Sequence, residues 1–331
     1  MRALSIQTLT GERTKADHPP ARWYGEETMN VQTPKKTQVA IMNAVHDLPV
    51  LVARDNGFFK DEGLDIEFVT TPGMAQVTTS HLVKFDSVFD RPLDSVYNEG
   101  GIDQYRMCEW GIMKRAVEAN AGGLRGRKIV ALGASMSKFA IVVSPKSKIY
   151  EPEMLKNKPI ATTPNNGSDF TTLKMMEGFL AQEHIKRTHA GSMLKRLEAV
   201  RDGKVAAASV MEPWISVAQK WGMRILIESH STRSEAAGDE LDGKTLAKMF
   251  RAQARACEAL EKDPAPYIHY FIAETGGLLE PKEFHTWRLL HAPPQPYTRE
   301  RFDDTYNWTV KWNMTVPGAT YETIVDNRAW S

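Results

Sequence analysis

Residues 38–69 read QVAIMNAVHDLPVLVARDNGFFKDEGLDIEFV and contain a strand, a helix and a second strand in a row. Gln38–Asn43 is a short apolar run, as in a buried strand. Leu48–Phe59 has apolar residues at helical spacing, and Gly57 ends that helix. Leu64–Val69 alternates between apolar and polar residues, as a strand does. This β-α-β order predicts the start of a doubly wound sheet.

The alternation of strands and helices continues along the chain. Apolar runs predict further strands at Lys128–Leu132, Phe139–Ser144, Pro159–Thr162, Ala206–Val210 and Arg224–Ile227. Amphipathic spacing predicts helices at Phe170–Gln182, Pro213–Trp221, Gly243–Asp263 and Thr298–Asn313. The sequence therefore indicates an α/β fold.

Length and composition limit the classes of function. The chain has 331 residues, of which 42% are hydrophobic, enough for about two domains. Its formal net charge of +1 gives no general attraction to nucleic acid or to an anionic membrane. No run approaches the roughly 18 apolar residues of a membrane-inserted helix. Cys108 and Cys257 share no CxxC spacing, which disfavours a disulfide framework or a structural zinc site.

The first 36 residues are polar and lack periodicity. We expect an N-terminal arm there that is disordered or packed on a neighbouring subunit, as in a homodimer. A secretory signal needs about 7–15 consecutive apolar residues. The longest candidate, Ala3–Ile6, is too short, so the sequence as given predicts a cytoplasmic protein.

Three segments resemble a known family. They are DNGFFKDEGLDIEF at Asp55–Phe68, LKNKPIATTPNNGSDFTTLKMMEG at Leu155–Gly178 and DGKVAAASVMEPWISVAQKWGMRILIES at Asp202–Ser229. The resemblance is to the SsuA/THI5-like group of type II periplasmic-binding-protein-fold proteins, which includes sulfonate, nitrate and pyrimidine-precursor binders. It spans residues 37–330.

This resemblance implies two doubly wound α/β lobes joined by hinge strands. Lobe one would hold residues 37–138 and 225–331, and lobe two residues 139–224. A small organic ligand would bind in a cleft between the lobes, because open α/β sheets bind ligands beyond the carboxyl ends of their strands.

Asn43 and His46 follow the first predicted strand, at the expected lip of that cleft. His46 could bind a ligand or move a proton near neutral pH, and Asn43 could bind beside it. The alternative is that Asp47 caps the helix and His46 is merely exposed.

Cys108, Glu109 and Trp110 form a second candidate group. A carboxylate partly desolvated beside Trp110 would have a raised pKa and could act as a general acid, with Cys108 nearby. Alternatively, Glu109 caps a helix and Cys108 is a small core residue.

The remaining candidates are polar or aromatic residues of the hinge and the second lobe. At the hinge, Ser135 and Ser137 could bond a ligand or cap backbone groups. Before the helix at residue 170, a loop could hold an anion on free N–H groups or act only as an N-cap; its residues are Asn165, Asn166, Gly167 and Ser168. After the strand at residue 210, Glu212 could accept a ligand hydrogen bond and Trp214 could stack on a ring, or the acid could simply precede the N1 proline of a helix.

The sequence has no phosphate-binding glycine loop and no metal-like histidine pairing, so we expect neither cofactor nor metal. We interpret the chain as a cytoplasmic enzyme on a binding-protein scaffold, a cofactor-free decarboxylase or desulfinase for an aromatic or other small organic acid. The alternatives are a solute-binding protein of an ABC importer, for a small organic anion, sulfonate or pyrimidine-like ligand, and a cytoplasmic ligand sensor. The nucleophile-like cysteine of the related desulfinase stands here as Ala44, so that mechanism does not carry over.

Overall fold

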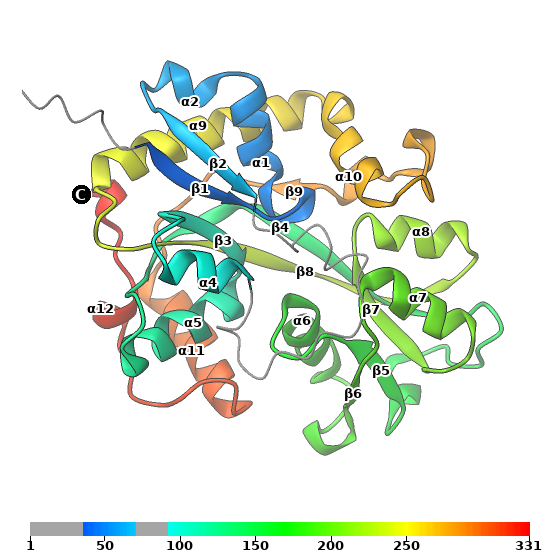
Figure 1. Ribbon diagram of the computed structural model, residues 1–331. Coiled ribbons are helices and arrows are strands. Elements are labelled where there is room, and N and C mark those ends of the chain that lie inside the picture. Colours follow the sequence, from blue (N-terminus) through cyan, green and yellow to red (C-terminus); the bar gives the residue numbers. More distant parts are fainter. Residues whose placement is uncertain (1–35, 71–91) are drawn as a thin grey trace, which may run out of the picture. The chain divides into compact units, whose positions relative to one another are not determined.

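The computed structural model describes residues 36–70 and 92–331, and these residues form a mixed α/β structure around one sheet (Figure 1). The sheet order is β2-β1-β3-β8-β4-β7-β5-β6, and β9 pairs with β4. The strands are β1 (Thr37–Ile41), β2 (Ile66–Thr70), β3 (Gln104–Cys108), β4 (Lys128–Val143), β5 (Pro159–Thr162), β6 (Lys186–His189), β7 (Ala207–Met211), β8 (Arg224–Ala237) and β9 (Leu290–His291). The predicted α/β class and the β-α-β unit at residues 38–69 are confirmed.

Two parallel groups of strands lie on either side of a long antiparallel pair. β1 is parallel to β2 and β3, while β5 is parallel to β6 and β7. β4 and β8 run antiparallel between the groups, and Figure 1 shows them continuing from one group to the other. The division into lobes at residues 138 and 225 stays a prediction. Apart from Lys36, the predicted N-terminal arm lies outside the described residues.

β4 and β8 are longer than predicted. The predicted strands Lys128–Leu132 and Phe139–Ser144 are parts of one strand, β4. Between them the small and polar residues of GASMSK break the apolar pattern, but a register shift between Leu132 and Met136 keeps the strand paired with β8. β8 likewise runs ten residues past the predicted end at Ile227, to Ala237.

The helices cover the faces of this sheet. The N-terminal ones are α1 (Ala44–Asp55), α2 (Phe58–Asp61), α4 (Pro92–Asn98), α5 (Glu109–Gly122) and α6 (Gly167–Met176). The later ones are α7 (Met193–Arg201), α8 (Trp214–Lys220), α9 (Gly243–Lys262), α10 (His269–Glu274), α11 (Arg299–Lys311) and α12 (Tyr321–Ile324). α1 begins four residues before the predicted start because Asn43, and not an apolar residue, sets its first turn.

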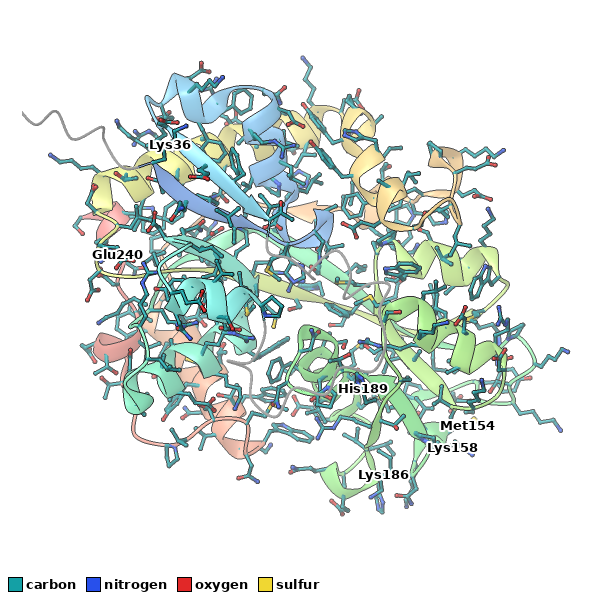
Figure 2. The ribbon with its side chains drawn as sticks, in the orientation of Figure 1. Lys36, Met154, Lys158, Lys186, His189 and Glu240 are labelled. Atoms are coloured by element: carbon teal, nitrogen blue, oxygen red, sulfur yellow. The ribbon has the colours of Figure 1, made fainter. Side chains whose placement is uncertain are left out.

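The apolar core has two clusters. One lies around β1, β3, α5 and α11 and includes Tyr97, Tyr105 and Tyr297. The larger one runs along β4 and β7 to α6, α8 and α9. At the edge of the sheet, β6 exposes Lys186 (Figure 2) and Arg187, and such charges discourage pairing with another strand. The buried strands hold the loop ends of β1, β3 and β7 in fixed positions.

Candidate functional site

The first turn of α1 positions two of the predicted site residues, Asn43 and His46. Asn43 caps the helix, and its side-chain Oδ1 accepts a hydrogen bond from the His46 backbone N–H at 3.1 Å. The same oxygen lies 2.7 Å from Nδ1 of the His46 ring. Because Oδ1 is an acceptor, Nδ1 carries the hydrogen, and Nε2 is the nitrogen left to exchange a proton with a ligand.

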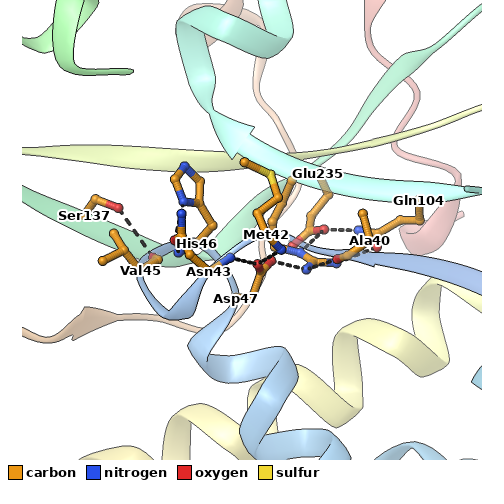
Figure 3. Close-up of polar contacts among 10 residues, drawn as sticks. Ala40, Met42, Asn43, Val45, His46, Asp47, Gln104, Ser137 and Glu235 are labelled. Carbon is orange, nitrogen blue, oxygen red and sulfur yellow. Dashed lines mark hydrogen bonds and ion pairs between the residues drawn. The ribbon is translucent and has the colours of Figure 1, made fainter. Parts of the chain in front are cut away.

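His46 is neutral at pH 7 in this environment. Burial lowers its pKa well below the usual value, and the positive charges of Arg233 and Arg106 lower it further. The ring is only half-buried, and Figure 3 shows it pointing away from Asp47. An anion bound beside the ring would oppose the two arginine charges and raise the pKa of His46 again.

Beneath this turn, a buried ionic network holds β1, β3 and β8 together (Figure 3). Arg106 forms ion pairs with both Asp47 and Glu235, and all three side chains are buried. Asp47 Oδ2 in turn accepts the backbone N–H of Asn43 at 2.9 Å. Asp47 thus fixes the chain just before the helix, while the cap itself is Asn43, contrary to the expected Asp47 cap. The network positions the loop that carries His46.

Ser137 connects this loop to β8. Pro49 has no backbone N–H, so the carbonyl of Val45, four residues earlier, lacks its usual helical donor. The Ser137 hydroxyl donates to that carbonyl at 3.4 Å, and the same Oγ accepts a hydrogen bond from Nη2 of Arg233. Ser137 therefore bridges the Val45 carbonyl in α1, which Pro49 leaves without a helical donor, and the buried guanidinium of Arg233.

Ser135, Ser137 and Glu212 line one small cavity. Its volume is about 20 Å³, which is enough for a water molecule. The rest of its wall comes from the start of α1, from β4, from α10 and from the segment that ends in β9, namely Ala44, Val45, Leu48, Pro49, Met136, Lys138, Phe271, Arg288, Leu289, Leu290 and His291. The structure thus brings Ser135, Ser137, Glu212 and the loop that carries His46 to one place.

Glu212 is buried at the end of β7. Its Oε2 accepts hydrogen bonds from the Ser216 backbone at 3.2 Å and from the Ser216 hydroxyl at 3.0 Å, and Arg288 donates to Oε1 at 3.3 Å. Burial nevertheless raises the pKa of Glu212 to about 7. Glu212 therefore titrates near neutral pH at the cavity wall.

This titration predicts that the protein becomes less stable as pH rises from 5 to 8. The folded pKa of about 7 exceeds the ordinary glutamate value of 4.5, so the folded state holds the proton more tightly than the unfolded chain. Above pH 7 that preference is lost, which costs up to roughly 3 kcal/mol of unfolding free energy. Urea unfolding across this range measures the slope. Glu212→Gln should make it shallower, whereas the exposed control Glu258→Gln should leave it unchanged; equal slopes in all three proteins would contradict the assignment.

Glu109 does not line this cavity and is bound instead to side chains of α11 and its neighbours. Its carboxylate accepts hydrogen bonds from Arg301 Nε at 2.8 Å and Nη2 at 2.7 Å, and further ones from Tyr297, Thr232 and Thr305. All five contacts donate to the carboxylate oxygens. This is a structural ion pair, and it does not support the predicted role of Glu109 as a general acid.

The two tryptophans of the predicted site are core residues. Trp110 packs on Trp308 with ring centroids 5.6 Å apart and on Phe170 at 6.4 Å. Trp214 begins α8 and is 2% exposed. Neither ring lines the cavity, and their stacking on a ligand stays a prediction.

The loop before α6 is capped by its own side chains. Asn166 Oδ1 accepts the Ser168 N–H at 3.1 Å, and Asp169 accepts the Asn165 N–H at 3.3 Å. Asp169 also places a carboxylate in the first turn of this helix. These contacts favour the N-cap interpretation over the anion-binding one.

Cys108 lies where α6 meets β3. A Cβ atom at Gly167 would lie 3.5 Å from the Cys108 Cβ, which is an ordinary van der Waals contact, so this approach does not require glycine. Cys108 is buried and pairs across the sheet with Arg233.

Arg233 is the residue that the sequence did not indicate. It lies in β8, beyond the predicted strand end at Ile227. Only the full length of β8 shows that it faces Cys108, Ser137 and His46. Arg233 could have been found from the sequence only by extending the predicted strand at Arg224–Ile227 to the full length of β8.

Residues 36–70 and 92–331 contain no cluster of side chains suited to a metal ion. In the same part of the chain, no helix is both long and apolar enough to cross a membrane.

Comparison with known proteins shows the fold. No protein-family model and no curated sequence match the chain. Among solved structures, it is similar to the alkanesulfonate-binding protein SsuA from Xanthomonas axonopodis pv. citri bound to MOPS, with 16% identity, a TM-score of 0.65 and coverage of 88% of this chain and 98% of that one. SsuA from Escherichia coli gives 14% identity, a TM-score of 0.65 and coverage of 89% and 92%.

An enzyme is also among the similar structures. The desulfurization enzyme DszB gives 13% identity, a TM-score of 0.56 and coverage of 89% of this chain and 98% of that one. A mutant of it has been solved with biphenyl-2-sulfinic acid. A conserved gene product of Candida albicans, described as having the generic periplasmic binding protein fold, gives 12% identity, a TM-score of 0.64 and coverage of 89% and 97%. The chain therefore has the periplasmic-binding-protein fold, the fold shared with SsuA-type sulfonate-binding proteins.

Proposed function

We propose that this chain is a cytoplasmic, cofactor-free lyase that binds a small organic acid beside His46 and protonates the carbon from which carbon dioxide or sulfur dioxide leaves. The observation that carries this proposal is the His46 ring itself. It is oriented by Asn43 through Nδ1, half-buried at the carboxyl end of β1, and close to two buried arginines.

The reaction needs one proton and no redox partner. In a decarboxylation the bond between the ring carbon and the carboxylate breaks, its electron pair stays on the ring carbon, and that carbon takes a proton. A sulfinic acid reacts in the same way, and the released sulfur dioxide takes up water to form sulfite. An electron-rich aromatic ring spreads the transient negative charge, and exclusion of water favours the loss of the charged group.

His46 can supply that proton only after the substrate binds. In the empty site its pKa is low, so the ring is neutral. A substrate carboxylate counters the charges of Arg233 and Arg106, which raises the pKa and loads the second proton on Nε2. The substrate thereby prepares its own acid.

The experiment measures release of carbon dioxide or sulfite from a panel of hydroxybenzoic acids and biphenyl-2-sulfinic acid. We expect the wild-type chain to convert at least one of them and His46→Gln to lose about 100-fold or more of that turnover. The exposed His269→Gln is the control and should retain wild-type turnover. Equal turnover in both variants would exclude His46 as the acid, and cell fractionation tests the cytoplasmic location.

Binding without turnover is the second candidate function. It is favoured by the SsuA structures, one of which holds MOPS, since their TM-scores of 0.65 exceed the 0.56 of the desulfurization enzyme. In the same experiment, an acid that binds but is not consumed supports a solute-binding protein. Failure to bind any acid contradicts both candidates.

A further inference from the structure

Arg233 differs from the other buried arginines of the described residues. Arg106, Arg115, Arg127 and Arg288 each form an ion pair with a carboxylate. Arg196 has no such pair, but its Nε and both Nη atoms donate to oxygens of Gly191, Ser209 and Thr163. Four of these five thus have a carboxylate counter-ion, although Nη2 of Arg115 is buried without a hydrogen-bond partner, and Arg196 donates from all three nitrogens. Such compensation of the charge is what a structural role requires.

Arg233 has neither kind of compensation within the described part of the chain. It is 0% exposed, and it donates only to Ser231 through Nη1 and to Ser137 through Nη2. Its Nε is buried without a hydrogen-bond partner. A buried guanidinium with an unpartnered donor and no direct counter-ion lowers the stability of the folded protein. An anionic ligand bound to Arg233 would supply the missing counter-ion.

The open donor lies on a defined edge of the guanidinium. Nε–H and Nη2–H point to the same side of an arginine and together match the two oxygens of a carboxylate. Arg301 shows this geometry in the same chain, with Nε and Nη2 at 2.8 and 2.7 Å from the two oxygens of Glu109. In Arg233 this edge faces Ser137, which lines the cavity beside the His46 loop.

We infer that the Nε–Nη2 edge of Arg233 binds the anionic group of the ligand, and that this group is a two-oxygen anion, a carboxylate or a sulfinate. The inference rests on the proposed function only in its ligand class, an organic acid. Ser137 shares the site, because its hydroxyl already contacts Nη2. Ser137 also lines the cavity of about 20 Å³, which places this edge next to the cavity wall.

Calorimetry with two matched pairs of probes tests this inference. The probes are benzoate with benzamide, and biphenyl-2-carboxylate with biphenyl-2-carboxamide. Arg233→Met should weaken binding of the acids at least tenfold, the size of one lost charge-assisted hydrogen bond or more, and should leave amide binding unchanged. Arg233→Lys keeps the positive charge but loses the paired Nε and Nη2 donors. Its affinity for the acids should therefore lie between that of the wild type and that of Arg233→Met. Acid binding that is unchanged in Arg233→Met, or acids and amides weakened alike, would overturn the inference.

Thermal unfolding of the empty protein gives a second readout that does not depend on any ligand. If Arg233 serves a ligand, Arg233→Met removes an uncompensated charge, and its unfolding midpoint should equal or exceed that of the wild type. A variant that unfolds at lower temperature, or fails to fold, would make Arg233 a structural cation and overturn the inference. Arg233-dependent acid binding without turnover defeats the lyase proposal alone. Wild-type protein that binds none of the acids defeats both.

Discussion

The Arg106→Met variant should lose about 3–5 kcal/mol of unfolding free energy. Arg106 is the only direct cation partner of Asp47 and Glu235 among the described ion pairs, and both carboxylates are 0% exposed. Methionine fills a similar volume but leaves two negative charges buried and close together. Their ionisation becomes unfavourable, and Asp47 then holds the backbone N–H groups of Met42 and Asn43 less firmly.

Urea unfolding followed by circular dichroism measures this loss. The matched control is Arg255→Met, the same substitution at a residue whose side chain is 40% exposed and pairs with Asp61 on the surface. That variant should change the free energy by less than about 1 kcal/mol. Similar stabilities for the two variants would show that the network in Figure 3 does not hold the strands together. Arg106 and Arg233 lie on neighbouring strands, so opposite effects of the same substitution would separate a structural arginine from a ligand-binding one.

The Glu109→Gln variant should lose about 3 kcal/mol of unfolding free energy, because five donors converge on its carboxylate. The glutamine amide has one acceptor oxygen where the carboxylate has two. Its NH₂ group would face the donors of Arg301 and Thr232, and an NH₂ group cannot accept their hydrogen bonds. α11 should therefore detach from α5 more readily. Hydrogen exchange of α11 would report this local loosening alongside global unfolding.

The control for this variant is Glu258→Gln on the exposed face of α9, which should stay within about 0.5 kcal/mol of the wild type. If Glu109 were the general acid considered in the sequence analysis, Glu109→Gln would instead lose turnover and keep its stability. A stable Glu109→Gln protein without turnover would restore Glu109 as a candidate acid and contradict the assignment made from its contacts.

The fold could be predicted because its pattern is local. Residues 38–69 show their strand, helix and strand in sequence periodicity, and all three elements form, although α1 spans Ala44–Asp55 and not the predicted Leu48–Phe59. β4 and β8 were harder because their middle sections pair with each other across a register shift, and that pairing does not depend on apolar alternation. β3 was missed as a strand for a similar reason, since QYRMC contains a buried arginine that only the partner charges of Asp47 and Glu235 make tolerable.

The candidate site could be predicted only in part. Residues directly after strands were accessible to sequence reasoning, and Asn43, His46, Ser137 and Glu212 do meet around one cavity and its adjoining loop. In the sequence, Glu109 and Trp110 looked as suitable for the site as the residues that meet at the cavity. Their partners on α11 lie nearly 200 residues later, and no local pattern reveals such a contact. Arg233 was missed because it is distinguished by the lack of a carboxylate partner among the described residues, and only the three-dimensional structure shows that.

A crystal structure of the full chain with bound biphenyl-2-carboxylate tests the central claim most directly. The account predicts one carboxylate oxygen within hydrogen-bond distance of Arg233 Nε, the other near Nη2 and Ser137, and His46 Nε2 facing the ring carbon that carries the carboxylate. A carboxylate bound instead at the start of α6, or on the surface away from Arg233 and His46, would contradict it.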